Sequence, residues 1–137
     1  MYSFVSQCDI MSIVRKEWKN ISSSSLPLGF SMPETSQTEP MAKVNHVSSR
    51  AISSIHFQET ITFKVWASGN NARRICFEEA SKMYEAMMDL WKDPDNFVTG
   101  TESISAVLVD IDPILEIPFA QFTIAFTTTN ERRRTIN

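Results

Sequence analysis

Alternation of apolar and polar positions marks the clearest strand of the chain, which ends in Trp66-Ala67. Successive side chains of a strand point to opposite faces, so residues of one parity share a face. This parity predicts one long bent strand over residues 55–67, paired back on a strand over residues 41–47. Five apolar residues define its inward face: Ile55, Phe57, Ile61, Phe63 and Val65.

Two stretches instead repeat their apolar residues at steps of three and four, which predicts helices over residues 2–19 and 72–91. The first helix has one apolar stripe: Phe4, Cys8, Met11, Val14 and Trp18. The second has a first stripe of Cys76, Ala80, Met83, Met87 and Leu90, and a second stripe of Phe77, Tyr84, Met88 and Trp91. We expect the side chain of Asn70 or Asn71 to cap the long helix.

Two further strands are predicted near the C-terminus. Residues 104–111 are apolar on both faces, which favours a central position in the sheet. Residues 119–128 alternate, which is typical of a half-exposed antiparallel strand.

Three prolines within 26–40 predict an extended connection, with a short edge strand over 28–32. Segregated helices and strands favour an α+β fold: a mostly antiparallel sheet of four to five strands, with an N-terminal helix and one long helix on one face.

Length and charge narrow the class of protein. The chain has 137 residues and a formal net charge of −3, so we expect a single domain over 1–129 and no overall attraction to nucleic acid or membranes. Residues 130–137 are expected to form a flexible basic tail. Two cysteines are too few for a disulfide framework, and no leader or membrane-spanning run is evident. We therefore expect a soluble protein made in the cytoplasm.

Candidate chemistry is sparse, and the sequence predicts no enzyme, no cofactor and no metal site. His46 and His56 lack the further ligands that a metal needs. Asp110 and Asp112 fit a solvated strand end better than an acid/base pair. Both cysteines, Cys8 and Cys76, lie in apolar stripes that disfavour a thiolate.

The chain has more apolar positions than the core of one small domain needs. Trp66 lies on the polar side of its strand, and the long helix has its second stripe. Two interpretations remain open: the first helix buries both features, or they form a subunit interface. The interface candidates are Trp66, Phe77, Tyr84, Met88 and Trp91.

The segments Ile61-Thr62-Phe63-Lys64-Val65-Trp66-Ala67, Asn71-Ala72 and Phe122-Thr123-Ile124-Ala125-Phe126-Thr127 resemble the tail terminator (tail completion, minor tail) proteins of long-tailed bacteriophages. By element order the resemblance covers residues 2–129, and at residue level it is confined to 61–76 and 119–127. The 48–58 segment lacks the glycines often found in that family, and the first helix is less rich in alanine.

The resemblance implies a non-enzymatic virion protein at the head-proximal end of the tail. Six copies would form a ring that caps the tail tube and joins it to the head–neck connector protein. DNA would pass through the lumen without specific binding, and the excess of acids between 89 and 116 suits such a lumen. Arg132, Arg133 and Arg134 are candidate contacts to a partner. The alternatives are another connector or head-closure adaptor, or a small enzyme or ligand-binding domain with a cleft near Asp110 and His46.

Overall fold

The protein is built on a four-stranded antiparallel sheet with the strand order β1-β2-β4-β3. The computed structural model describes residues 7–22, 40–93 and 97–129. In chain order the elements are α1 (Gln7–Ile21), β1 (Met41–Ala51), β2 (His56–Trp66), α2 (Ala72–Met88), the short 3-10 helix η1 (Leu90–Lys92), β3 (Val98–Ile111) and β4 (Pro118–Thr129).

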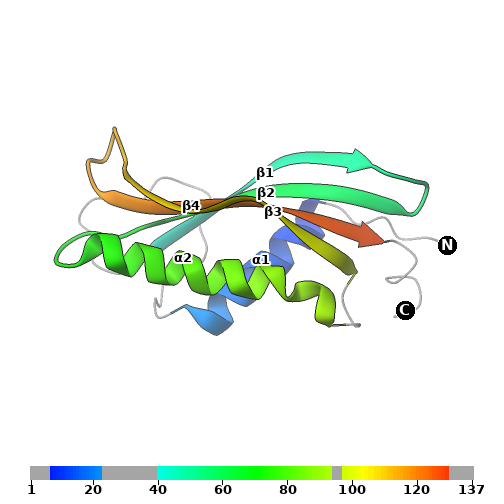
Figure 1. The fold of residues 1–137 in the computed structure, drawn as a ribbon, viewed down its shortest axis with the longest axis horizontal. Helices are drawn as coiled ribbons and strands as arrows, with labels where there is room; N and C mark the ends of the chain where they lie inside the picture. The colour runs from blue at the N-terminus through cyan, green and yellow to red at the C-terminus, as the bar shows by residue number, and fades with distance from the viewer. Residues whose placement is uncertain (1–6, 23–39, 94–96, 130–137) are drawn as a thin grey trace.

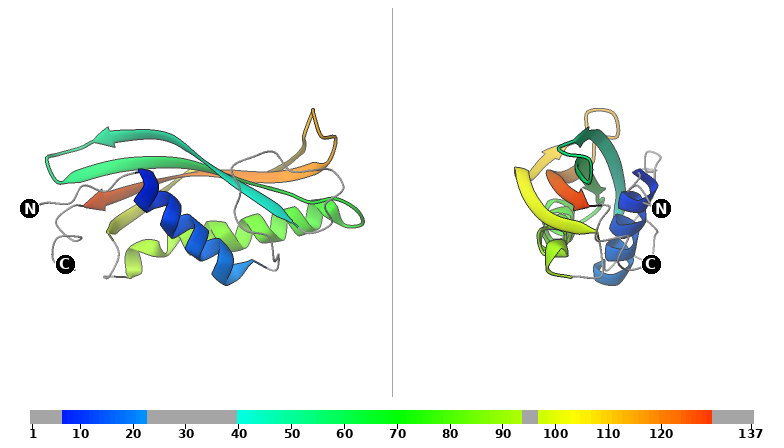
Figure 2. Two further views of the ribbon diagram at one scale, coloured as in Figure 1. Left: turned by 180° about the vertical axis from the view of Figure 1, so that it is seen from behind. Right: turned by 90° about the vertical axis from the view of Figure 1, so that its right-hand side faces the viewer.

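Both helices lie on the same face of the sheet, and no described element covers the other face (Figures 1 and 2). α2 packs against β4, β3 and β2, whereas α1 packs against α2 and β1. The α+β class, the single helical layer and the predicted packing of the long helix are therefore confirmed. The expected edge strand over 28–32, the N-terminal six residues and the tail lie outside the described residues.

The core lies between the sheet and the helices. Of the five residues predicted to face it from β2, Ile55 lies outside the strand and Phe57 is half-buried. Ile61, Phe63 and Val65 of β2 are buried, and so are Phe122, Ile124 and Phe126 of β4. The Phe63 and Phe122 rings stack with centroids 5.3 Å apart, and Trp18 of α1 lies 5.6 Å from Phe63. Burial of each such aromatic side chain stabilises the fold by about 2–3 kcal/mol, so β2 and β4 form the centre of the domain.

Most residues of the stripes predicted to face the core are buried in the two helices, with some differences. The first stripe of α2 is buried as predicted: Cys76, Ala80, Met83, Met87 and, in η1, Leu90. In α1 the buried residues are Ile10, Val14 and Trp18, whereas Met11 is only half-buried. The predicted cap of α2 is wrong in its chemistry: Asn71 is the N-cap residue but makes no side-chain cap hydrogen bond. Its backbone instead adopts a left-handed conformation at φ 61°, which asparagine tolerates better than most residues.

The predicted central position of the strand over 104–111 is wrong. This strand, β3, starts earlier, at Val98, and forms one edge of the sheet, while β4 lies between it and β2. Its pairing with β4 is interrupted by register shifts at 103–105 and 105–108. These shifts break the alternation of inward and outward side chains, and Ile104 and Leu108 are exposed.

Candidate interaction surface

Trp66 lies on the helix-free face of the sheet, as its parity predicts, but it is only 2% exposed. Its indole Nε1 donates a hydrogen bond of 3.0 Å to Oδ2 of Asp112, a residue of the β3–β4 loop. The Nζ of Lys64 lies 3.9 Å from the same oxygen and 4.0 Å from the centroid of the Phe119 ring. The same ammonium lies 5.1 Å from the centroid of the Trp66 ring, and Phe119 of β4 is the cross-strand neighbour of Trp66. Side chains of β2 and β4 and the β3–β4 loop therefore surround the indole.

Asp112 holds the β3–β4 loop in place through three hydrogen bonds. Besides the indole, it accepts bonds from the backbone N–H groups of Ile114 and Leu115, each 2.9 Å long. These backbone hydrogen bonds, with that of Trp66, hold the pKa of the Asp112 carboxyl below its usual range, although burial opposes them. An ionised, fully bonded carboxylate at this position fixes the loop to the sheet.

The burial of Trp66 corrects its assignment as a subunit-interface residue, because a side chain enclosed by its own chain offers no contact surface. The second stripe of the long helix divides in two. Tyr84 and Met88 are half-buried, and the Tyr84 ring meets Phe122 edge-on at 5.5 Å. Phe77 is 45% exposed and Trp91, which lies in η1, is 46% exposed. Of the five candidates, Phe77 and Trp91 present the most surface. The first helix does not cover this stripe alone, since Tyr84 packs on β4.

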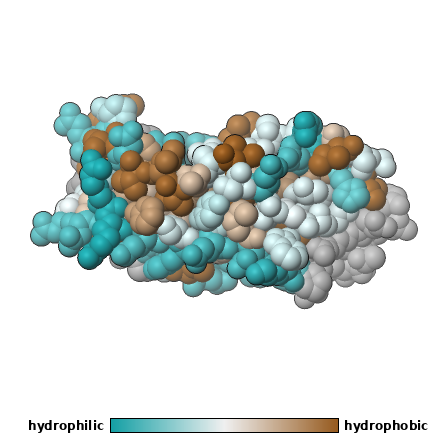
Figure 3. Space-filling model, in the orientation of Figure 1, coloured by the Kyte–Doolittle hydropathy of each residue, from teal (hydrophilic) through white to brown (hydrophobic). Residues whose placement is uncertain are grey.

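Exposed apolar side chains also follow β3 and the β3–β4 loop. Leu108 is 57% exposed, Ile114 at the loop is 80% exposed, and Ile104 and Ile111 are exposed as well. Figure 3 shows the largest group of apolar residues at the end that carries the β3–β4 loop and the start of α2, with smaller groups elsewhere on this face. We call Phe77, Ile104, Leu108, Ile111 and Ile114 the β3 apolar surface. Sequence reasoning missed the contribution of β3 because it placed this strand in the centre of the sheet.

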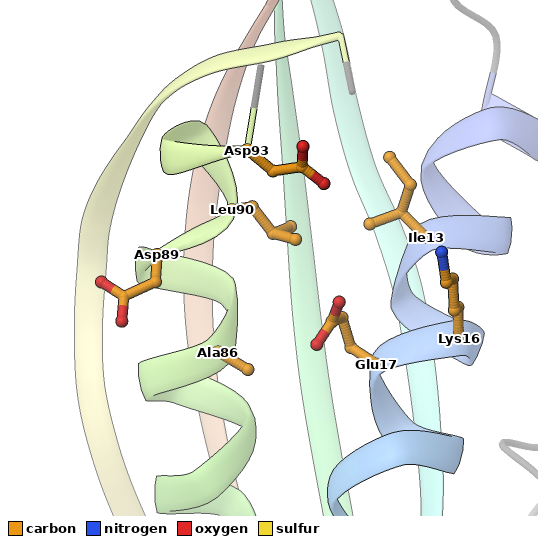
Figure 4. Close-up of a pocket in the computed structure, with 7 residues that line it drawn as sticks. All are labelled: Ile13, Lys16, Glu17, Ala86, Asp89, Leu90 and Asp93. Atoms are coloured by element: carbon orange, nitrogen blue, oxygen red, sulfur yellow. The ribbon is translucent and has the colours of Figure 1, made fainter. Parts of the chain in front are cut away.

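A pocket of about 290 Å³ lies between α1 and the end of α2 (Figure 4). Ile13 and Leu90 form its apolar part, and the carboxylates of Glu17 and Asp93 point into the space between the helices. Asp89 points away from that space and pairs with Lys92 at 3.0 Å. Lys16 also lines the pocket, and the lining contains no serine, threonine, cysteine or histidine, so it lacks the hydroxyl or thiol nucleophile and imidazole base of a hydrolytic site.

The fold places the other candidate catalytic and metal-binding residues far apart. His46 lies on edge strand β1 and Asp110 on the opposite edge strand β3, so the cleft expected between them is not formed. His46 pairs with Ile61 of β2, and Ile61 lies five residues after His56 on that strand. The two histidines are therefore not cross-strand neighbours. No three acid, histidine or cysteine side chains in the described residues form a group that could hold a metal ion. Cys76 is buried, which raises the pKa of its thiol.

Among the residues that the structure describes, neither helix is both long and apolar enough to cross a membrane. Arg132, Arg133 and Arg134, the predicted partner contacts, lie outside the described residues. No protein-family model and no curated protein sequence matches this chain.

Proposed function

We propose that the chain is a structural protein of a long-tailed phage virion, a tail terminator that forms a ring on the tail tube and joins it to the head–neck connector. The observation that carries the proposal is the β3 apolar surface. Exposed apolar side chains that gather on one part of a protein mark contact surfaces, and five large ones are exposed on β3, the β3–β4 loop and α2. The order of elements, helix, two strands, helix, two strands, supports the same resemblance.

Self-assembly and binding to tail tubes test this proposal together. We expect rings in electron micrographs and a multimeric mass by light scattering, with the purified chain alone or after addition of tail tubes. Phe77→Ser and Leu108→Ser should weaken assembly. Ile52→Ser is the matched control, because Ile52 is similarly exposed but lies in the turn between β1 and β2, at the other end of the sheet.

The genes that flank the coding sequence provide an independent test. A tail terminator should be encoded close to a major tail protein and a tape-measure protein. If neither gene is present and the chain ignores tail tubes, the proposal is wrong. Binding to a head–neck connector without binding to tail tubes would favour the alternative, another adaptor at the same junction.

A further inference from the structure

The two edge strands of the sheet carry opposite charge. β1 contains Lys43 and Arg50 and no acid, whereas β3 contains Glu102 and Asp110 and no lysine or arginine. All four belong to the helix-free face of the sheet. Lys43 and Arg50 are in register with Lys64 and Gln58 of β2, and Glu102 and Asp110 with Ala125 and Phe119 of β4. None of the four makes an ion pair within the described chain.

The spacing of the charges matches as well. The β2 partners of Lys43 and Arg50 are residues 64 and 58, which are six ladder positions apart. The β4 partners of Glu102 and Asp110 are residues 125 and 119, which are also six positions apart. At about 3.4 Å per residue, each pair of charges therefore spans about 20 Å along its edge. The positions are counted along the neighbouring strands β2 and β4. The extra residues at the bulges of β1 and β3 therefore do not change the spacing.

Strand direction permits these edges to join. Each neighbouring pair in β1-β2-β4-β3 is antiparallel, so β1 and β3 run in opposite directions (Figure 1). A second copy placed beside the first in the same orientation would bring its β1 antiparallel to β3. The helix-free faces would then be continuous, and the edge backbone groups that pair with no other strand among the described residues could form a ladder.

We propose that copies of this chain associate head to tail by pairing β3 of one copy with β1 of the next, in the register that sets Asp110 opposite Lys43 and Glu102 opposite Arg50. Two exposed apolar residues at the irregular positions of the strands, Ile104 and Val47, then lie close together across the junction. Opposite charges directly across a strand pair stabilise it, and like charges destabilise it.

The same charges select against the two symmetric alternatives. Antiparallel pairing of β3 with β3 would set acids against acids, and pairing of β1 with β1 would set bases against bases. A head-to-tail contact joins two different patches and produces a closed ring or an open filament, whereas a symmetric contact stops at a dimer. The inference rests on the proposed function only for ring closure, since edge pairing itself needs no phage partner.

Cysteine cross-linking tests the pairing directly. In a Cys8→Ser background, the double variant Lys43→Cys/Asp110→Cys should give a ladder of covalent multimers with a short bismaleimide. The two positions lie on opposite edges, about 14 Å apart across three strand spacings, so the short reagent should not join them within one sheet. Variants with only one of the two introduced cysteines, which keep the buried Cys76, should give no ladder. Strong dimer formation by Asp110→Cys alone would mean β3–β3 pairing and would overturn the proposal.

Charge reversal provides the second measurement. Lys43→Glu/Arg50→Glu should raise the dissociation constant of self-association about tenfold or more, and so should Glu102→Lys/Asp110→Lys. Because the two patches meet in one contact, the chain with all four changes should regain association. Matched controls are Lys19→Glu on α1 and Glu85→Lys on α2, both exposed and away from the edges.

The outcomes separate this inference from the proposed function. Multimers that persist in both reversed variants, without the cross-linked ladder, would overturn edge pairing and leave the tail terminator proposal intact. A ladder and rescue by the fourfold variant, with no binding to tail tubes, would support edge pairing and count against the tail terminator. A chain that stays monomeric and gives no ladder at any concentration overturns edge pairing.

Discussion

Replacement of Trp66 should unfold the single chain rather than disrupt an assembly. The indole is 2% exposed beside Lys64, Phe119 and Asp112, and its Nε1 donates a 3.0 Å hydrogen bond to the Asp112 carboxylate. Trp66→Ala removes a large buried ring and leaves a cavity, which costs about 3–5 kcal/mol of unfolding free energy. Because small domains are stable by only about 5–15 kcal/mol, a large part of the native stability should be lost.

Two milder variants isolate the hydrogen bond from the packing. Trp66→Phe keeps most of the ring but removes the donor, so we expect a loss of about 1–3 kcal/mol. Asp112→Ala leaves the indole N–H and the N–H groups of Ile114 and Leu115 without their acceptor, and should cost about 3–5 kcal/mol. The double variant should cost less than the sum, because both changes remove the same bond.

Urea unfolding, followed by tryptophan fluorescence and far-UV circular dichroism at low protein concentration, measures these changes in the monomer. The pKa of Asp112 is lowered in the folded state, so its contribution is present above the ordinary aspartate pKa, about 4. It is lost as the pH falls through the lowered value. The penalty of Asp112→Ala should therefore shrink below about pH 4. If Trp66→Ala left monomer stability within about 0.5 kcal/mol of the original and abolished only assembly, Trp66 would be a surface residue and this account would be wrong.

Three further outcomes follow from the packing. Tyr84→Ala removes the edge-on contact with Phe122 and should lower the unfolding free energy by about 2 kcal/mol in urea titrations, because the ring is half-buried; an unchanged midpoint would contradict this packing. Phe77→Ser should change monomer stability by less than about 1 kcal/mol, since its ring is largely solvated, and a larger loss would place it in the core. Cys76 in a Cys8→Ser background should resist alkylation in the native protein and react on unfolding, because burial raises the pKa of its thiol; rapid native labelling by mass spectrometry would show it to be accessible.

The sequence alone determined the elements whose signals are local. Alternation identified β2 and β4 and their large residues that face the helices, because a side chain's face in a strand follows from its parity. It did not predict that β4, expected to be half-exposed, has buried residues on both faces. The helical stripe of Cys76, Ala80, Met83 and Met87 identified the buried face of α2 for the same kind of reason. The antiparallel sheet and the helices on one face followed from the order of these elements.

The choice of edge strands and the cover over Trp66 depend instead on contacts between distant parts of the chain. Strand order depends on pairing between segments far apart in the chain, and β4 pairs with both β2 and β3. The bulges in β3 shift its parity, so the apolar residues that suggested a central strand lie partly on the surface. Trp66 is enclosed because the β3–β4 loop carries Asp112 back to it, a contact between residues 46 positions apart. No local pattern encodes such a contact, because it forms only when the loop and the sheet are both in place.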